Sequence, residues 1–140
     1  MSGEVQALVN YYARAQYPRH IQTVCAEVLK KRANDPVLQF WRAYGLVKEG
    51  SYSEALRELE SLQGKREVEV SSMACMIYAH KLCKIVDEEA IQDLEDRIQS
   101  EERNATERTL VQAATFYWLQ GGYANLEKAK DMCIKVLEIQ

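Results

Sequence analysis

The sequence predicts an all-α fold in which helix–turn–helix pairs stack side by side into a solenoid. Apolar residues recur at the spacing of a helix face from the start of the chain, as in Val5, Leu8 and Tyr12, and no stretch alternates apolar and polar residues with period two. The chain has 140 residues but only 2 Pro and 6 Gly, so long helices can run without interruption. Turn-forming residues divide the chain into segments of helical length.

Eight helices are predicted, one for each segment between turns. The turns are marked by Tyr17 with Pro18, and by residues 34–36, 50–52, 63–64, 85–87, 104 and 121–122. The segments between them have roughly 10 to 18 residues, a length typical of globular helices. The predicted helices comprise residues 3–16, 19–33, 36–49, 52–63, 66–83, 87–102, 105–120 and 125–139.

The clearest helix pair comes from residues 36–63. Its first helix contains Ala43 and ends at Gly50, after which Tyr52 and Ala55 lie at the start of the second helix. Gly50 can take the left-handed conformation that costs another residue about 1–2 kcal/mol. The small side chains of Ala43 and Ala55 allow the two helices to approach closely.

Three weaker copies of this pattern surround the clear one. In the first copy, Tyr17 and Pro18 stand where a glycine and an aromatic residue belong, and in the third copy residues 83–86 replace the glycine turn. In the fourth copy, Gly121 is followed by a predicted loop over 122–126, about three residues longer than the pattern expects. The four copies predict four helix pairs wound into a right-handed superhelix.

Four such copies in succession resemble the tetratricopeptide repeat family, over essentially the whole chain. A narrower resemblance is to the N-terminal region of the large tetratricopeptide-repeat subunit of the intraflagellar transport A complex. The residues that carry it are the pair Tyr11 and Tyr12 and residues 35–37, 40–50, 54–60 and 77–81.

The resemblance implies a role in a large assembly. Proteins of that family are far longer than this chain, consist of repeats throughout, and serve retrograde transport in cilia and delivery of membrane cargo into them. We therefore expect residues 1–140 to form a single tetratricopeptide-repeat domain, the N-terminal fragment of a longer repeat protein. The implied location is the cytoplasm and the cilium or flagellum, and the implied partners are subunits or cargo of a transport complex.

Composition argues against other classes of partner. The net charge of −3 disfavours a phosphate-binding surface, so no nucleic acid partner is expected, and a helical-repeat RNA-binding protein would need a basic groove. No apolar run approaches the ~18 residues of a membrane span, so direct membrane insertion is not expected. An acidic stretch over residues 87–107 indicates either a solvated helix face or a patch for a basic partner.

Nothing in the sequence predicts catalysis, and neither a cofactor nor a metal site is expected. His20 and His80 are the only histidines, and neither has a second ligand at a recognised spacing. No glycine-rich phosphate loop and no nucleophile elbow occurs. The four cysteines lie in apolar helical stretches and are interpreted as core residues. They are Cys25, Cys75, Cys83 and Cys133. A thiol pair between Cys75 and Cys83 is conceivable, because both lie on one predicted helix.

A protein-binding groove is predicted on the first helices of the pairs, because these helices line the concave surface of such a stack. The candidate groove residues are Phe40, Tyr44, Val47, Val111, Thr115 and Trp118. The competing interpretation places Trp41 and Trp118 in the core between helices. A peptide-binding co-chaperone adaptor is the alternative function. It is disfavoured because Gln39 and residues 42–44 do not supply the Lys, Asn and Arg set with which some family members hold a C-terminal carboxylate.

A second candidate surface is the end of the last helix. Apolar residues recur there at spacings of three and four, in a stripe wider than packing against one helix requires. We expect the fragment to self-associate through this open end or to fray there, and a fifth repeat to cover the same surface in the full-length protein. The candidate interface residues are Met132, Val136, Leu137 and Ile139.

Overall fold

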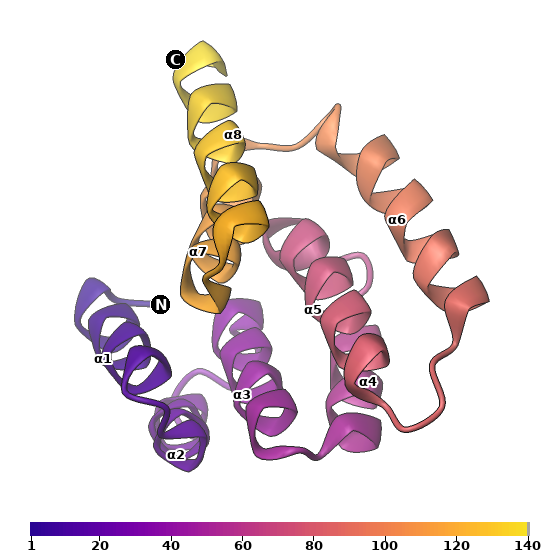
Figure 1. Cartoon of the computed structure of the whole chain (residues 1–140). Helices are drawn as coiled ribbons and strands as arrows, with labels where there is room; N and C mark the ends of the chain where they lie inside the picture. The colour runs from indigo at the N-terminus through magenta and orange to yellow at the C-terminus, as the bar shows by residue number, and fades with distance from the viewer. Residues whose placement is uncertain (140) are drawn as a thin grey trace.

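The computed structural model describes residues 1–139, which form eight α-helices and one short 3-10 helix, η1, with no β-strand among them (Figure 1). The predicted all-α class is therefore confirmed, and Gln140, the last residue of the predicted domain, lies outside the described residues. The elements are α1 (Gly3–Arg14), α2 (Pro18–Leu29), α3 (Pro36–Glu49), α4 (Tyr52–Glu60), η1 (Arg66–Val68), α5 (Glu69–Leu82), α6 (Glu88–Glu102), α7 (Glu107–Gln120) and α8 (Tyr123–Ile139).

Side-chain caps explain where several helices begin. Asp35 precedes α3 and accepts hydrogen bonds from the backbone N–H groups of Val37 and Leu38, while Pro36 occupies the first turn, where no N–H is needed. Ser2, Asp87 and Thr106 cap α1, α6 and α7 in the same way. These polar residues satisfy N–H groups that have no partner inside the helix.

All eight predicted helices are present, but several of the predicted bounds are wrong; the helix predicted for 52–63, for example, ends at Glu60. The helix predicted for 19–33 ends at Leu29, and the one predicted for 66–83 begins with η1 before α5. The predicted long loop over 122–126 is absent because α8 begins at Tyr123. Gly121 and Gly122, with φ of 72° and 86°, make the turn by themselves, and the fourth pair therefore follows the pattern more closely than the sequence indicated.

The first two helix pairs use the same backbone turn. Gly50 has φ 96°, and the next residue, Ser51, donates its N–H to the Leu46 carbonyl over 2.9 Å. Gln16 has φ 63°, and Tyr17 donates its N–H to the Tyr12 carbonyl over 2.9 Å. Both are helix ends closed by a bond across five residues, which needs a left-handed residue. In the first pair, glutamine takes the place that glycine takes in the second.

Neighbouring pairs are joined by close packing of α2 on α3 and of α4 on α5. Gly45 of α3 makes the first of these crossings possible. A Cβ atom there would lie 2.8 Å from the Cγ of Gln22 and 2.9 Å from the carbonyl oxygen of Pro18, both in α2. No side chain fits at this position without movement of α2, so the crossing depends on glycine.

The stack curls so strongly that helices of non-adjacent pairs touch. Phe116 of α7 packs edge-on against Phe40 and Tyr44 of α3, with ring centroids 6.0 and 5.9 Å apart. α1 also contacts α7, which brings the first pair against the fourth. In a regular solenoid each repeat contacts only its neighbours. Here the first helices of the pairs converge, and their aromatic side chains fill the inside of the curl. α6 and α8 diverge at the outside (Figure 1).

Candidate protein-binding surfaces

Half of the predicted groove lies in the core. Phe40 and Tyr44 are 0% exposed and Val47 is 1% exposed, so these three side chains present no surface to a partner, and their assignment to a groove is corrected. The cause is the contact of α3 with α7, which occupies the space that an open concave face would leave free. The Tyr44 hydroxyl donates to the Oε1 of Gln120 over 3.3 Å, and burial raises the pKa of that hydroxyl.

The other half of the predicted groove remains on the surface of α7. Val111 and Trp118 are 48% and 43% exposed, and Thr115 is half-buried with its hydroxyl bonded to the Val111 carbonyl. The core interpretation is confirmed for Trp41, which is fully buried, but it is wrong for Trp118. A binding role for the three α7 residues stays a prediction.

A cleft lies where the ends of α1, α3 and α7 meet the start of α2, and we call it the α1–α7 cleft. Its volume is about 620 Å³, within the range of small binding sites. Aromatic, aliphatic and basic side chains line it, chiefly Tyr12, Arg14, Tyr17, Lys48, Trp118 and Leu119. It exists because the first and fourth helix pairs are brought together.

Two cations face this cleft without a carboxylate partner among the described residues. The Arg14 guanidinium lies 5.3 Å from the centroid of the Trp118 ring. Lys48 donates from its Nζ to the Tyr78 hydroxyl over 3.1 Å and lies 5.3 Å from the Tyr78 ring. Both contacts are with aromatic groups, which attract a cation but leave its charge uncompensated.

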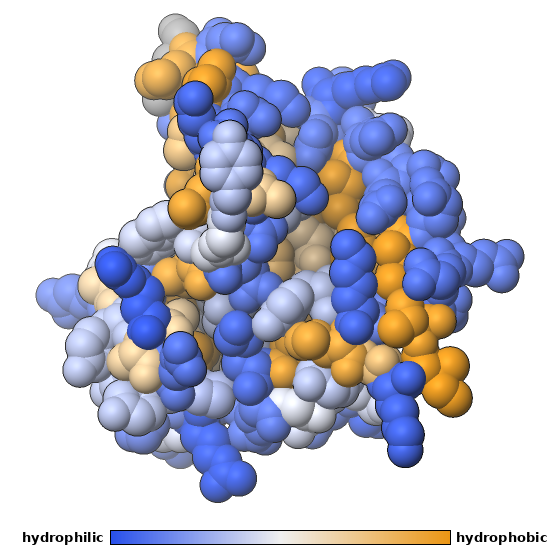
Figure 2. Space-filling model, viewed as in Figure 1, coloured by the Kyte–Doolittle hydropathy of each residue, from blue (hydrophilic) through white to orange (hydrophobic). Residues whose placement is uncertain are grey.

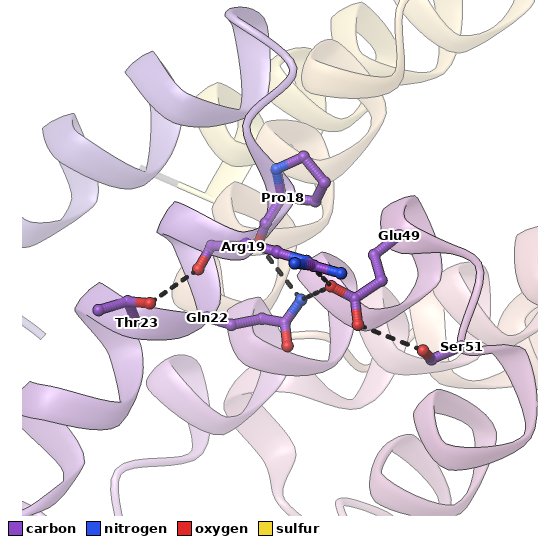
Figure 3. Close-up of polar contacts among 6 residues, drawn as sticks. All are labelled: Pro18, Arg19, Gln22, Thr23, Glu49 and Ser51. Carbon is purple, nitrogen blue, oxygen red and sulfur yellow. Dashed lines mark hydrogen bonds and ion pairs between the residues drawn. The ribbon is translucent and has the colours of Figure 1, made fainter.

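The carboxylate next to Lys48 in the chain is engaged elsewhere, as Figure 3 shows. Glu49 accepts from the Gln22 side chain over 3.0 Å and from the Ser51 hydroxyl over 3.3 Å, and its carboxylate pairs with Arg19 over 3.4 Å. Gln22 also donates to the Pro18 carbonyl over 3.4 Å. This cluster ties the start of α2 to the end of α3 beside the cleft.

A second hollow, of about 510 Å³, lies between α6 and α8 over a floor from α5 and α7. Figure 2 shows hydrophobic surface between α8 and the hydrophilic outer side of α6. Its walls carry both signs of charge, and the ammonium of Lys135 pairs with Glu102 over 3.4 Å. Burial, with a smaller effect of Glu102, raises the pKa of Tyr117 to about 12.

The predicted open end divides into a buried and an exposed part. Met132 is 4% exposed and belongs to the core, and Val136 is half-buried against it, whereas Leu137 and Ile139 are 70% and 54% exposed. Three further apolar side chains of α8 are exposed but were not among the predicted interface residues, and the first of them precedes the predicted helix start at residue 125. They are Tyr123, Leu126 and Ile134.

The cysteines, histidines and carboxylates of the described part of the chain form no metal-binding group. Cys25 and Cys75 are fully buried, and burial raises the pKa of the Cys25 thiol to about 12 and that of Cys75 further still. His20 lies between the rings of Tyr12 and Tyr17, at 5.1 and 5.3 Å. Within residues 1–139, no group of three His, Cys, Asp or Glu side chains could hold a metal ion. No helix in the same range has the length and apolar character needed to cross a membrane.

Stacked helix pairs with a shared core, and apolar side chains left exposed on the last helix, define an α-helical repeat protein of the protein-binding scaffold class. Residues 9–140 match the family model described as the tetratricopeptide repeat protein 21 N-terminal ARM repeat, and the chain belongs to this family.

Similar curated proteins agree with this family. The chain is 36% identical over 135 residues to tetratricopeptide repeat protein 21B of Homo sapiens and 38% identical over 135 residues to tetratricopeptide repeat protein 21A of Homo sapiens. In each case the match covers 96% of this chain and 10% of the relative. A match of 35% identity to the 21B protein of Mus musculus covers 91% of the chain and 9% of that relative. The chain thus spans about a tenth of the length of these relatives, and the resemblance to a large tetratricopeptide-repeat protein is confirmed.

Proposed function

We propose that the chain is a non-catalytic scaffold segment of the intraflagellar transport A complex, which binds other subunits or cargo during retrograde ciliary transport and ciliary cargo delivery. Its membership of the tetratricopeptide repeat protein 21 family supports this role. So does the resemblance carried by Tyr11 and Tyr12 and by residues 35–37, 40–50, 54–60 and 77–81. We propose further that residues 1–140 are one repeat domain of a longer protein that works in the cytoplasm and the cilium.

The observation that carries the scaffold role is the uncovered outer face of α8. Tyr123 is 82% exposed and Leu137 is 70% exposed, and Leu126 and Ile134 are each more than two fifths exposed. Exposed apolar side chains gathered on one helix face are a common feature of protein interaction sites. In a stack of helices, such a face is covered by another helical element.

Affinity capture from ciliated cells, with the chain as bait, tests this proposal. We expect the wild-type chain to recover other subunits of the transport complex, and the variant with Leu126→Glu and Leu137→Glu to recover far less. Lys84→Glu is the matched control, since it makes the same change in net charge at an exposed position outside α8. Equal recovery by all three proteins, or capture of no transport subunit by the wild type, would contradict the proposal.

A further inference from the structure

We propose that the α1–α7 cleft binds an acidic peptide segment of a partner protein, with carboxylates of the segment between Arg14 and Lys48 and an apolar side chain against Trp118. This inference rests on the proposed scaffold function and adds the chemical class of one partner segment. The cleft is a separate surface from the outer face of α8.

The charged side chains that line the cleft are all basic. Arg14 and Lys48 line it, and no Asp or Glu does. The chain as a whole carries a net charge of −3, so the cleft opposes the general trend of the surface. The hollow between α6 and α8 offers the contrast, because its lining balances acidic and basic side chains. Those are Glu95, Glu102 and Asp131 against Lys81, Lys128 and Lys135.

Neither Arg14 nor Lys48 is paired with a described carboxylate, so both can bind an anionic ligand. Both side chains are exposed. Arg14 contacts the Trp118 ring. Lys48 contacts the Tyr78 ring and donates to the Tyr78 hydroxyl over 3.1 Å, so neither cation is paired with an anionic group of the described residues. Glu49, the carboxylate next to Lys48 in the chain, is held by Arg19, so that pair is neutral. A carboxylate that enters the cleft therefore meets two uncompensated positive charges on walls from two different helices.

Apolar surface lies beside the two cations in the cleft. Trp118 is 43% exposed and Tyr17 is 51% exposed, and Leu119 is half-buried next to them. Aromatic side chains with few rotamers provide contact area at a small loss of conformational entropy. The combination fits a peptide in which acidic residues alternate with apolar ones. A free inorganic anion would use only the cations.

The cleft is held open by contacts of the core. Gln120, which also lines it, is held by the Tyr44 hydroxyl, and α7 is fixed against α3 through Phe116. The walls therefore need little reorganisation when a segment binds. Because α1 and α7 belong to the first and fourth helix pairs, a bound segment would bridge the two ends of the stack.

The chain contains its own reporter for the test. Trp118 is 43% exposed in the cleft and Trp41 is fully buried, so a change in tryptophan emission on binding comes from Trp118. The probe is a short peptide of alternating glutamate and leucine, which has no fluorescence of its own. We expect a saturable change in emission that weakens as salt is added, and no such change for the matched peptide with glutamine in place of every glutamate.

Substitutions then locate the site. The double variant Arg14→Gln and Lys48→Gln should bind the glutamate peptide at least about tenfold more weakly. The variant with Lys84→Gln and Arg108→Gln makes the same change in net charge outside the cleft and should bind like the wild type. Trp118→Phe should remove the signal in emission, and calorimetry then measures binding of that variant directly.

Several outcomes would overturn the inference. If the glutamine peptide binds as tightly as the glutamate peptide, the contact is only apolar. If the two double variants lose the same amount of affinity, the attraction depends on net charge and not on the cleft. Displacement of the peptide by a short polyuridine at lower concentration would assign the cleft to a nucleic acid instead. If the wild type captures transport subunits but binds no glutamate peptide, the scaffold function stands and the cleft inference fails. If the wild type binds the peptide but captures no transport subunit, only the cleft inference stands. Loss of capture with retained peptide binding in the α8 variant supports both proposals.

Discussion

The substitution Gly45→Ala isolates the crossing of α2 and α3. Helix propensity alone favours alanine over glycine inside a helix by about 1 kcal/mol. The added Cβ would meet the Gln22 Cγ at 2.8 Å and the Pro18 carbonyl oxygen at 2.9 Å, and the second of these is backbone that moves only with the first turn of α2. Overpacking of this kind costs about 1–3 kcal/mol. Because one of the two partners is backbone, we expect a cost in the upper part of this range, about 2–3 kcal/mol, and hence a net loss of about 1–2 kcal/mol after the gain in propensity.

Urea denaturation, monitored by circular dichroism, measures this loss. Equal dependence of the unfolding free energy on urea in the wild type and the variant shows that the denatured state is unchanged. The corresponding fall in melting temperature is about 3–6 °C for a domain of this size. Gly3→Ala is the matched control, because a Cβ at Gly3 meets nothing within 4 Å and stability should change by less than about 0.5 kcal/mol.

A second background assigns the clash to one of its two partners. In Gln22→Ala the Cγ contact is gone, so any loss that Gly45→Ala still causes there comes from the Pro18 carbonyl. A Gly45→Ala protein that is more stable than the wild type by about 1 kcal/mol, as propensity alone predicts, would refute the close crossing.

Four further predictions test other parts of the structure. Gly50→Val should lose about 1–2 kcal/mol in a denaturation experiment because φ is 96° there, whereas Gln16→Gly, at φ 63°, should gain up to about 1 kcal/mol; an effect of the same sign in both would contradict the shared turn. Ala55→Leu should cost about 1–3 kcal/mol by overpacking, since Ala55 is fully buried, and an unchanged midpoint would place it at the surface. Leu137→Glu should shift any oligomer of the chain toward monomer in sedimentation, and an unchanged distribution would separate self-association from α8. The free energy of unfolding should fall as pH rises from about 9 toward 12. In this range the Cys25 thiol loses its proton in the unfolded chain, whereas burial raises its pKa and keeps it protonated in the folded chain. The slope should be smaller in Cys25→Ala, and an equal slope would assign it to other groups.

Local signals in the sequence are enough to place most of the fold. Asp35 and Pro36 mark the start of α3, and Gly50 marks its end, because capping and a left-handed residue act within one helical turn. Tyr17 and Pro18 predicted the turn after α1, but the left-handed conformation of Gln16 was not predicted, because glutamine, unlike glycine, gives no local signal for it.

The candidate site was harder to predict because it depends on contacts between distant parts of the chain. Helical spacing showed that Phe40 and Tyr44 share a face, but not that Phe116 of a non-adjacent pair covers that face. The α1–α7 cleft has the same origin, since Arg14, Lys48 and Trp118 meet only when the stack curls. No local pattern in the sequence joins these three residues.

The contact between α1 and α7 also has a consequence for how the chain unfolds. Repeat proteins with contacts only between neighbours can fray from either end, one helix pair at a time. Here the edge-on contacts of Phe116 with α3, and of α7 with α1, place the first, second and fourth pairs in one cooperative unit. A pulling force applied across this segment should therefore meet one mechanical barrier that includes α1, α3 and α7, while α6, which packs mainly on α5, can detach before it.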